Sequence, residues 1–569
     1  MASPSFPEPP PSMPATSIEK CDALVSTLNA NKDAWTKISI NERIELLEEC
    51  IENTLAVGQE WVEAGCRAKG IEPQSKLAGE VWFAGPTTTI RNMRLLVETL
   101  KAGGQPKPPQ QWTRSNGQTV ARVFPADLYD RILFTGFTAD VWIEPGKPAT
   151  QGNIYRQKSY GKNAEGKVSL VLGAGNISSI GPMDMLYKLF VEDEVVLLKT
   201  NPVNAYTGPM VERAFAPLIN RGFFAVVHGG AEVGKHLCAH DGIDTIHITG
   251  SDQTHDAIVW GGTKKQIKER KKAGTPGNER PVTSELGCVT PVFVVPGAWS
   301  DVELDYQARQ VAAMVAHNGS FNCNAAKVLV TAKNWPLRDE FIHRVKQTLA
   351  CTPPRKAYYP GAEKRFEQFV KKYPEALQLG ENGPEIVPWT LIPDVACKKN
   401  EYALTNEAFC GVIADLAIDA TEADEFLDKA VEFANTNIWG TLSCCMLIHP
   451  NTEKQYGAAF ERAIANLQYG GIGINCWPGL IYGLCVTTWG AFPGHPLEDI
   501  ESGRGVVHNT YLFDHPQKSV VKAPFRIRPT PVWFADHRTL ADVGKAMANF
   551  EASPSLLRLP TVVAPALRG

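Results

Sequence analysis

Hydrophobic spacing divides the chain into a helical first part and two later parts in which strands and helices alternate. Apolar residues recur every three or four positions over residues 17–53 and 58–100, and this spacing predicts helices. The proline-rich run Pro106–Gln111 ends the helical part. Residues 120–130 and 140–143 then have the pattern of strands.

Four short apolar runs follow from Lys167, each separated from the next by a helical pattern. Continuous apolar strands with helices between them predict a parallel sheet that is buried on both faces. Ligands of such sheets bind beyond the carboxyl ends of the strands. We therefore expect the four strand-end turns to surround one crevice: Gly173–Asn176, Lys199–Asn201, Gly229–Gly230 and Gly250–Ser251.

A second alternating unit begins near Thr283. The predicted strands of this unit are residues 290–296, 326–331 and 441–449, and helical patterns lie between them. The part after Leu512 is punctuated by proline, and its pattern is ambiguous. The fold class predicted for the chain is α/β, with two doubly wound parallel-sheet domains.

Composition places the chain among ordinary globular proteins. It has 569 residues, 44% hydrophobic and 21% charged, with a formal net charge of −4. This charge predicts neither a nucleic-acid partner nor a membrane partner, and no apolar run reaches the ~20 residues of a membrane-spanning helix.

The start of the chain, residues 1–17, is rich in proline and serine, so we expect a disordered tail and, without a targeting pattern, a cytoplasmic location. The thirteen cysteines show no CxxC spacing, so we expect reduced thiols and no metal site.

The segment His317–Lys327, HNGSFNCNAAK, carries the clearest chemistry. Its pattern predicts a helix, a tight Asn-Gly turn, Cys323 and then a strand. This geometry presents a sulfur atom and backbone N–H groups to one small space. A thiolate attacks carbonyl carbon, and nearby N–H donors can hold the resulting oxyanion. The alternative for Cys323 is a buried structural cysteine.

Three further charged residues lie at positions where a charge can bind a ligand or transfer a proton. Lys199 ends the second strand, where a common dinucleotide site has an acidic residue, so a cation there favours an anionic ribose substituent such as a 2′-phosphate. Glu285 lies just before a predicted strand, and Glu407 lies between apolar segments. A carboxylate in a protected cleft can take a proton from a thiol or from water. The alternative is that all three are ordinary surface side chains.

Seven short motifs occur in an order and spacing that resemble the aldehyde dehydrogenase superfamily, over roughly Glu19 to Phe513. They are GAGN, LLKTNP, TGS, ELG, NGSFNC, NEAFCG and NIWGT. The resemblance implies an N-terminal nucleotide-binding domain, a catalytic domain and a small oligomerisation strand element. The corresponding boundaries are 18–283 (with bridging strands near residues 140–160), 284–490, and a return segment over 491–569.

The resemblance also implies roles for individual residues. Cys323 resembles the catalytic nucleophile, Asn176 the side-chain donor to the oxyanion, and Glu285 the base that activates the deacylating water. The implied cofactor-binding residues are Lys199, Gly250, Ser251, Glu407 and Phe409. The residues that match the family's substrate tunnel are Phe321, Trp477, Trp489 and Phe492. Aromatic walls favour an apolar or aromatic aldehyde, whereas the alternative is that these rings are packed core.

Several departures from the family pattern affect the cofactor. The family's Pro-Trp-Asn is here Ala174-Gly175-Asn176, and its Phe-Gly-Pro is Phe409-Cys410-Gly411. Three places after its lysine the family has an acidic residue, and this chain has Pro202 at that position. This difference favours NADP, or the use of both nucleotides, over NAD alone. The basic insertion over residues 261–280 is either a solvated face or a contact for an anionic cofactor or acyl carrier.

The function expected from the resemblance is NAD(P)-dependent oxidation of an aldehyde to the carboxylic acid through a cysteine thiohemiacetal and thioester. One alternative is an acylating aldehyde dehydrogenase or acyl-CoA reductase, although Glu285 favours hydrolysis. A second alternative is a catalytically silent binding protein on the same fold. The expected partner is a small-molecule aldehyde, and the expected assembly is a homodimer or homotetramer.

Overall fold

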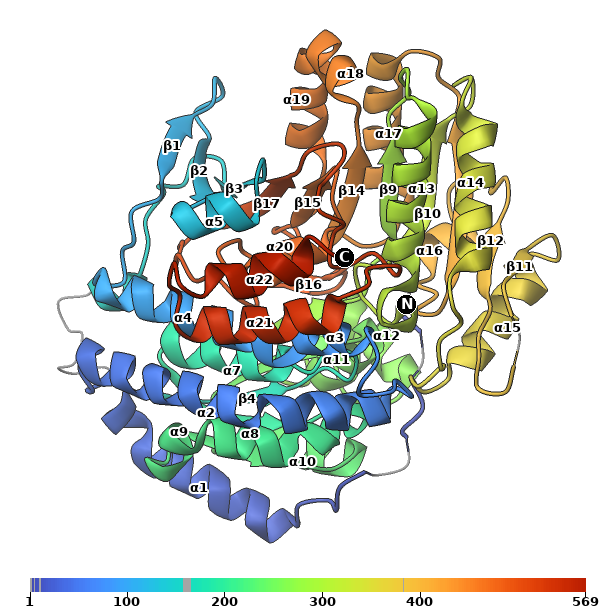
Figure 1. Cartoon of the computed structure of the whole chain (residues 1–569). Coiled ribbons are helices and arrows are strands. Elements are labelled where there is room, and N and C mark those ends of the chain that lie inside the picture. Colours follow the sequence, from blue (N-terminus) through green and yellow to red (C-terminus); the bar gives the residue numbers. More distant parts are fainter. Residues whose placement is uncertain (1–2, 5, 10–11, 157–164, 382) are drawn as a thin grey trace.

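A six-stranded sheet forms the framework of the first half of the chain in this computed structural model, which describes residues 3–4, 6–9, 12–156, 165–381 and 383–569 (Figure 1). Four of its strands are the predicted apolar runs, and they pair in parallel. In spatial order the strands are β16 (Gly503–Arg504), β8 (Val282–Leu286), β7 (Thr245–Gly250), β4 (Lys167–Leu172), β5 (Glu194–Lys199) and β6 (Phe224–Val227).

Helices connect these strands, as the alternating pattern predicts. The predicted helix over residues 207–220 is divided, because prolines lie at the first turns of separate segments. The elements are α7 (Ile180–Phe190), η2 (Pro202–Thr207), α8 (Gly208–Ala214), α9 (Ala216–Asn220), α10 (Ala231–Ala239), α11 (Asp252–Val259) and α12 (Lys264–Ala273).

An eleven-stranded sheet forms the second framework. Its central strands pair in parallel, and antiparallel strands extend it at both edges. The order is β1 (Gln110–Thr113), β2 (Thr119–Phe124), β3 (Thr138–Ile143), β17 (Pro516–Lys522), β15 (Gly471–Ile474), β14 (Ser443–Leu447), β9 (Thr290–Val294), β10 (Ala326–Ala332), β13 (Val412–Ile418), β12 (Trp389–Ile392) and β11 (Leu377–Leu379).

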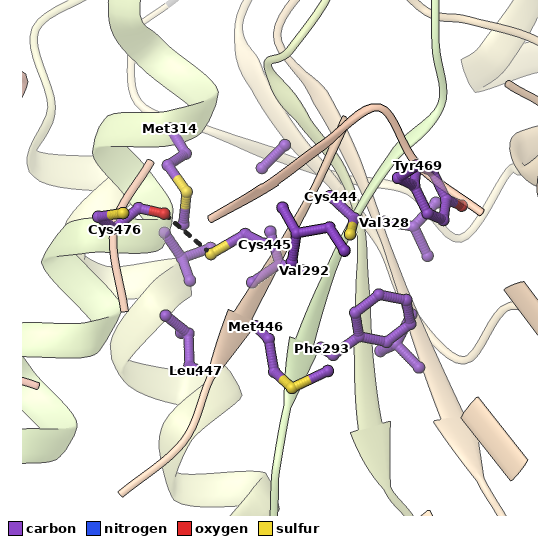
Figure 2. Close-up of a cluster of buried hydrophobic side chains, with 14 of the residues drawn as sticks. Val292, Phe293, Met314, Val328, Cys444, Cys445, Met446, Leu447, Tyr469 and Cys476 are labelled. Carbon is purple, nitrogen blue, oxygen red and sulfur yellow. Dashed lines mark hydrogen bonds between the residues drawn. The ribbon is translucent and has the colours of Figure 1, made fainter. Parts of the chain in front are cut away.

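The centre of this sheet is a dry core. Strand β14 runs between β9 and β15, and its adjacent cysteines point in opposite directions, as expected for a strand (Figure 2). Cys445 Sγ lies 3.3 Å from the Cys476 carbonyl oxygen, while Cys444 lies on the side of Tyr469. All thirteen cysteines are free thiols.

Helices cover the eleven-stranded sheet and complete the second unit. The helical patterns that separate the predicted strands of this unit form helices in the structure. The elements are α13 (Asp301–Ala316), η3 (His317–Ser320), α14 (Arg338–Cys351), α15 (Ala362–Lys372), α16 (Tyr402–Thr405), α17 (Ala423–Asn437), α18 (Pro450–Gln455), α19 (Gly457–Asn466) and α20 (Gly479–Leu484).

The N-terminal helical part is more divided than the spacing predicts. Ser39 forms a capping box with Glu42, so a new helix begins after residue 39. A second break lies at Gly85, whose backbone is non-helical. The elements are α1 (Ile18–Trp35), α2 (Ile40–Ala68), α3 (Ala78–Trp82), η1 (Phe83–Thr87) and α4 (Thr88–Lys101).

Two C-terminal helices pack on this N-terminal part, in red beside blue in Figure 1. They are α21 (Leu540–Ala552) and α22 (Leu559–Ala566), and α21 contacts both α3 and α4. Among the described residues, every helix is too short or too polar to cross a bilayer.

Three expectations about segments require correction. The predicted strand over residues 120–130 ends at Phe124, because Asp127 caps the short helix α5 (Leu128–Leu133). Glu285 lies inside β8, a strand of the six-stranded sheet that the pattern did not predict, and the predicted strand after it, β9, begins at Thr290. β8 thus has residues on both sides of the boundary expected at residue 284. β8 is short and directly follows the basic insertion, so the hydrophobic pattern did not predict this strand.

The bridging segment and the return segment meet within the chain. β3 pairs antiparallel with β17. The short helix α6 (Asn153–Arg156) follows β3 along the chain. The end of the bridging segment, from residue 157, lies outside the described residues. Whether either strand also serves oligomerisation stays a prediction.

Candidate active site

Two cavities meet at Cys323. The larger is a cleft of about 1050 Å³ along the carboxyl ends of β4, β5 and β7, where the topology predicted a crevice. The smaller is a tunnel-like cavity of about 160 Å³ between the two frameworks. The residues that line both are Asn176, Ile180, Glu285 and Cys323. The structure thus brings together the three predicted catalytic residues, which are far apart in sequence.

The predicted order of helix, turn, cysteine and strand is confirmed around Cys323. Helix α13 ends at Ala316, the turn follows, and β10 begins at Ala326. Asn318 and Gly319 take positive φ values of 54° and 67°, which suit an Asn-Gly pair. This turn reverses the chain so that Cys323 faces the junction of the cavities.

A network of hydrogen bonds fixes the turn against the GAGN loop. Lys69 donates to Asn318 Oδ1 (2.8 Å) and to the Asn176 carbonyl (3.1 Å). The Tyr358 hydroxyl donates to the same two oxygens, at 3.1 and 3.2 Å. Burial lowers the pKa of Lys69 to about 8, although Glu80 opposes this shift. Sequence reasoning missed Lys69 and Tyr358, since no motif marks them.

Glu285 and Cys323 form an interacting pair. Burial raises the pKa of the Glu285 carboxyl to about 8, while hydrogen bonding to the Cys323 thiol opposes the rise. Burial, and then the Glu285 charge, raise the pKa of the Cys323 thiol well above its usual range. Both groups therefore favour their protonated forms at neutral pH. The neutral Cys323 thiol lies beside the Glu285 carboxyl group, and the two can exchange a proton.

Asn176 is positioned by the backbone beside Cys323. Its Nδ2 donates to the Phe321 carbonyl (2.9 Å), which leaves the second amide hydrogen for another acceptor. Among the described residues, no hydrogen bond is made by the Cys323 backbone N–H. Asn176 and Cys323 both line the junction of the two cavities.

Glu407 makes a buried ion pair that the sequence did not reveal. Lys327 Nζ lies 3.1 Å from Glu407 Oε1 and also donates to the Cys323 carbonyl (3.2 Å). The Cys288 N–H donates to the same carboxylate at 3.4 Å. A Cβ on Gly287 would lie 1.9 Å from Glu407 Oε2, so a glycine is required there. Lys327 thus links the cleft wall to the cysteine loop.

All the predicted cofactor residues line the large cleft: Lys199, Gly250, Ser251, Glu407 and Phe409. Lys199 ends β5, and burial lowers its pKa to about 8, with Glu8 acting in the opposite direction. The Ser251 side chain accepts from the Thr254 N–H and begins α11, so a helix N-terminus opens on the cleft. A cation and a helix N-terminus in one cleft fit an anionic ligand.

The basic insertion forms helix α12, whose two faces differ. Thr263, Gln266 and Arg270 line the mouth of the cleft. Lys264, Lys265 and Lys268 are exposed to solvent. Among the described residues of this helix, Arg270 is the basic side chain that lines the cleft.

Two of the four residues predicted to line the substrate tunnel line the small cavity, and two do not. Trp477 and Trp489 line the small cavity. Phe321 does not; it is buried between Tyr358 and Phe409, because the turn rotates it away from the sulfur. Phe492 lies outside the cavity too, where its ring faces Lys518.

The structure adds cavity walls that no local pattern marked. They come from η1, α4, α20 and the C-terminal segment, and they include Phe83, Arg91, Tyr482, Trp533, Met547 and Glu551. The walls are mostly apolar or aromatic.

The N-terminal segment lies in the large cleft, which corrects the prediction of a disordered tail for its described residues. Phe6 packs edge-on against Tyr359 and Phe409, with ring centroids 5.2 and 5.3 Å apart. Ser3 is buried, and its carbonyl accepts from Gln253 Nε2 (2.8 Å). Proline favours extended chain, which suits a segment laid along a groove.

One cluster outside these cavities brings together Asp22, His236 and His240. Asp22 Oδ1 lies 2.6 Å from His236 Nε2 and 3.4 Å from His240 Nε2. His240 Nδ1 accepts from the Gly242 N–H, so the neutral ring carries its proton on Nε2, toward Asp22. Hydrogen bonds therefore account for this arrangement.

Comparison with known proteins agrees with the geometry. The model of the aldehyde dehydrogenase family matches residues 176–358. The chain is 28% identical over 181 residues to N-succinylglutamate 5-semialdehyde dehydrogenase of Novosphingobium aromaticivorans, covering 32% of this chain and 35% of that protein. It is 23% identical over 294 residues to mouse retinal dehydrogenase 2, covering 49% and 51%. The chain thus spans between a third and a half of the length of these relatives.

Solved structures share the fold over most of the chain. The aldehyde dehydrogenase KauB from Pseudomonas aeruginosa superposes with a TM-score of 0.60 at 15% identity, covering 89% of each chain. An NADP complex of glyceraldehyde-3-phosphate dehydrogenase from Bacillus halodurans gives 0.55 at 17% identity, covering 90% and 92%.

The fold is therefore the α/β fold of these aldehyde dehydrogenase structures. Residues 176–358, which carry Asn176, Glu285 and Cys323, are similar to the aldehyde dehydrogenase family.

Proposed function

We propose that the protein oxidises an apolar or aromatic aldehyde to the carboxylic acid with NAD(P) as acceptor. The observation that carries this proposal is the meeting of the two cavities at Cys323, with Asn176 and Glu285 beside it. A nucleotide in the cleft and an aldehyde in the small cavity would both reach the sulfur. A catalytically silent protein would have no need of this junction.

The cleft residues fit a nicotinamide nucleotide. Lys199 and the start of α11 face an anionic ligand, and Pro202 in place of an acid leaves room for a 2′-phosphate. Both nucleotides remain part of the proposal, with NADP favoured. When bound, the nucleotide would supply the hydride acceptor.

The chain's own residues would carry the covalent steps. Glu285 takes the proton of the Cys323 thiol, and the sulfur attacks the aldehyde carbon to give a thiohemiacetal. Asn176 Nδ2 and the Cys323 N–H hold the oxyanion. Loss of hydride leaves a thioester on Cys323. Glu285 then loses the thiol proton to solvent and takes a proton from water as the water oxygen attacks the thioester. It returns this proton to the departing sulfur, so that the acid leaves and the thiol is restored.

Acyl transfer to coenzyme A is the second candidate. The absence of the family's Pro-Trp-Asn triplet and the position of Arg270 at the cleft mouth favour it. Glu285 disfavours it, because a base beside the thioester promotes attack by water.

Two variants test the proposal. Cys323→Ala should lose turnover of an aldehyde panel while nucleotide binding, measured by calorimetry, is kept. Glu285→Gln should give one burst of reduced nucleotide and accumulate a thioester visible by mass spectrometry. Turnover by Cys323→Ala contradicts the nucleophile assignment. Release of the thioester by coenzyme A but not by water in the wild type would favour the acylating reaction.

A further inference from the structure

Two chemically different groups of residues line the small cavity. Cys323, Glu285 and Asn176 form the reactive group. The second group comes from α4 and from the C-terminal segment, and its members are Arg91, Trp533, Met547 and Glu551. This second group contains polar side chains, although most of the cavity lining is apolar.

Arg91 is fixed in this wall by its neighbours. Its Nε donates to the Leu484 carbonyl (2.9 Å), and its Nη1 donates to Glu551 Oε1 (2.6 Å). Its Nη2 lies 3.6 Å from Asp130 Oδ1, beyond hydrogen-bond distance, and has no hydrogen-bond partner among the described residues. The guanidinium therefore cannot turn away to satisfy this nitrogen without breaking its other bonds.

Trp533 supplies the second unsatisfied donor. Its indole lines the cavity and is 7% exposed, and its Nε1 has no hydrogen-bond partner in the described part of the chain. Buried donors in native proteins are rarely left unpaired, and each one calls for an acceptor such as a ligand or an ordered water. Two such donors in one wall of a substrate cavity point to an acceptor on the substrate.

The charges around Arg91 decide what kind of acceptor fits. Glu551 pairs with both Arg91 and Arg94, and Asp130 faces Arg91 from α5. Two cations are thus matched by two carboxylates, and no net positive charge remains for a carboxylate substrate.

Resting on the proposed function, we propose that the preferred aldehyde carries a neutral oxygen acceptor at the end remote from its aldehyde group. Arg91 Nη2 and Trp533 Nε1 donate to this oxygen, while the apolar walls hold the carbon chain between.

The test compares alkanals with ω-methoxyalkanals and ω-oxo acids of equal chain length. The methoxy oxygen accepts a hydrogen bond and cannot cyclise onto the aldehyde. We expect kcat/KM of the wild type to be about tenfold higher for the best methoxyalkanal than for its alkanal. Trp533→Phe keeps the ring and removes the N–H, so it should lower this ratio several-fold. Arg91→Lys, which keeps the charge, should lower it too.

Trp299→Phe is the matched control. Trp299 Nε1 also lacks a hydrogen-bond partner among the described residues, but Trp299 packs in the core with Trp335 and does not line the cavity. Its variant should keep the wild-type ratio. Equal use of both aldehydes at every length, a preference for the oxo acids, or an equal change of the ratio in both tryptophan variants would overturn the subsite. Failure to oxidise any aldehyde would instead contradict the proposed function.

A second inference is carried independently by the N-terminal segment. Phe6, Pro7, Glu8 and Pro9 line the large cleft together with Lys199 and Gly230. Arg365 stacks over the Phe6 ring at 5.1 Å, and Thr16 exchanges two hydrogen bonds with the backbone of His228. Anchors on both sides of Glu8 thus hold this segment across the cleft.

Glu8 occupies a place that a nucleotide would need. A Cβ on Gly230 would lie 1.4 Å from Glu8 Oε1, so the carboxylate fits against the strand-end turn only because that residue is glycine. The carboxylate also brings to Lys199 the negative charge that a cofactor phosphate would bring. We infer that residues 6–9 compete with the nucleotide for the cleft.

Nucleotide binding to the full chain tests this competition. Phe6→Ala should tighten the Kd of NADP about threefold to tenfold, because the nucleotide binds only molecules whose segment has left the cleft. Pro14→Ala, at an exposed position of the same segment, is the control and should leave Kd unchanged. An unchanged Kd in Phe6→Ala overturns the inference, and a weaker Kd shows that the segment belongs to the binding site. Absence of nucleotide binding in every variant contradicts the proposed function itself.

Discussion

The pairing of Glu285 with Cys323 makes a quantitative prediction for the dependence of the reaction on pH. Burial raises the pKa of Glu285 to about 8 and raises that of Cys323 well above its usual range. Both groups act in their deprotonated forms, so both shifts move activity toward alkaline pH. The perturbation is therefore pH itself, with Glu285→Gln as the variant that separates the two groups.

The magnitude follows from the pKa of Glu285. A group with a pKa near 8 is about one-tenth ionised at pH 7, half ionised at pH 8 and about nine-tenths ionised at pH 9. If water attack on the thioester limits turnover, kcat should rise about tenfold between pH 7 and pH 9. An ordinary exposed glutamate would be ionised throughout this range and would give a flat profile.

The assay measures kcat at saturating aldehyde and nucleotide across this range, and alkylation of Cys323 by iodoacetamide separately. Glu285→Gln removes the charge that disfavours the thiolate, so at pH 8 it should be alkylated faster than the wild type. A kcat that is level from pH 7 to pH 9, together with equal alkylation rates, would refute the pairing. A rise in both the wild type and the variant would assign the pH dependence to the thiol alone.

Two further predictions concern the cleft and the packing of the termini. Lys199→Ala should weaken binding of NADP by about tenfold or more and binding of NAD much less, since charged hydrogen bonds contribute about 1.5–3 kcal/mol. Calorimetry measures both affinities, and Lys264→Ala, at an exposed position, is the control. Equal losses of affinity for the two nucleotides would show that Lys199 does not contact a 2′-phosphate. Gly79→Ala should lower the free energy of unfolding in urea by about 1–3 kcal/mol or more, because its Cβ would lie 2.4 Å from the Leu540 backbone at the start of α21. Gly457→Ala, which meets open space, should not destabilise, and equal stability of the two variants would contradict the close contact of α3 with α21.

The sequence predicted those parts of the site that lie in local motifs. Asn176 follows β4, Cys323 precedes β10, and Glu285 lies near the carboxyl end of β8. The ends of parallel strands gather by topology, so the meeting of these residues was predictable. Phe321 was misassigned because a spacing of two residues from the cysteine does not reveal the positive-φ turn that rotates it.

Other parts of the site leave no local signal. Arg91, Trp533 and Glu551 reach the cavity only because helices from opposite ends of the chain pack together, and such contacts add no periodicity to either segment. Lys327 reads as a strand residue, since its role depends on Glu407 across the sheet. The N-terminal segment has the composition of a disordered tail, and only the cleft that receives it gives it a place.

The position of β17 between β3 and β15 has a consequence for synthesis. Translation completes β3 more than three hundred residues before it reaches Pro516, which at about 5–20 residues per second is a delay of tens of seconds. Throughout that time the nascent hairpin presents a strand edge without its neighbour, and such edges invite pairing between chains. A molecule still on the ribosome is therefore open to pairing with other chains at that edge until its partner emerges.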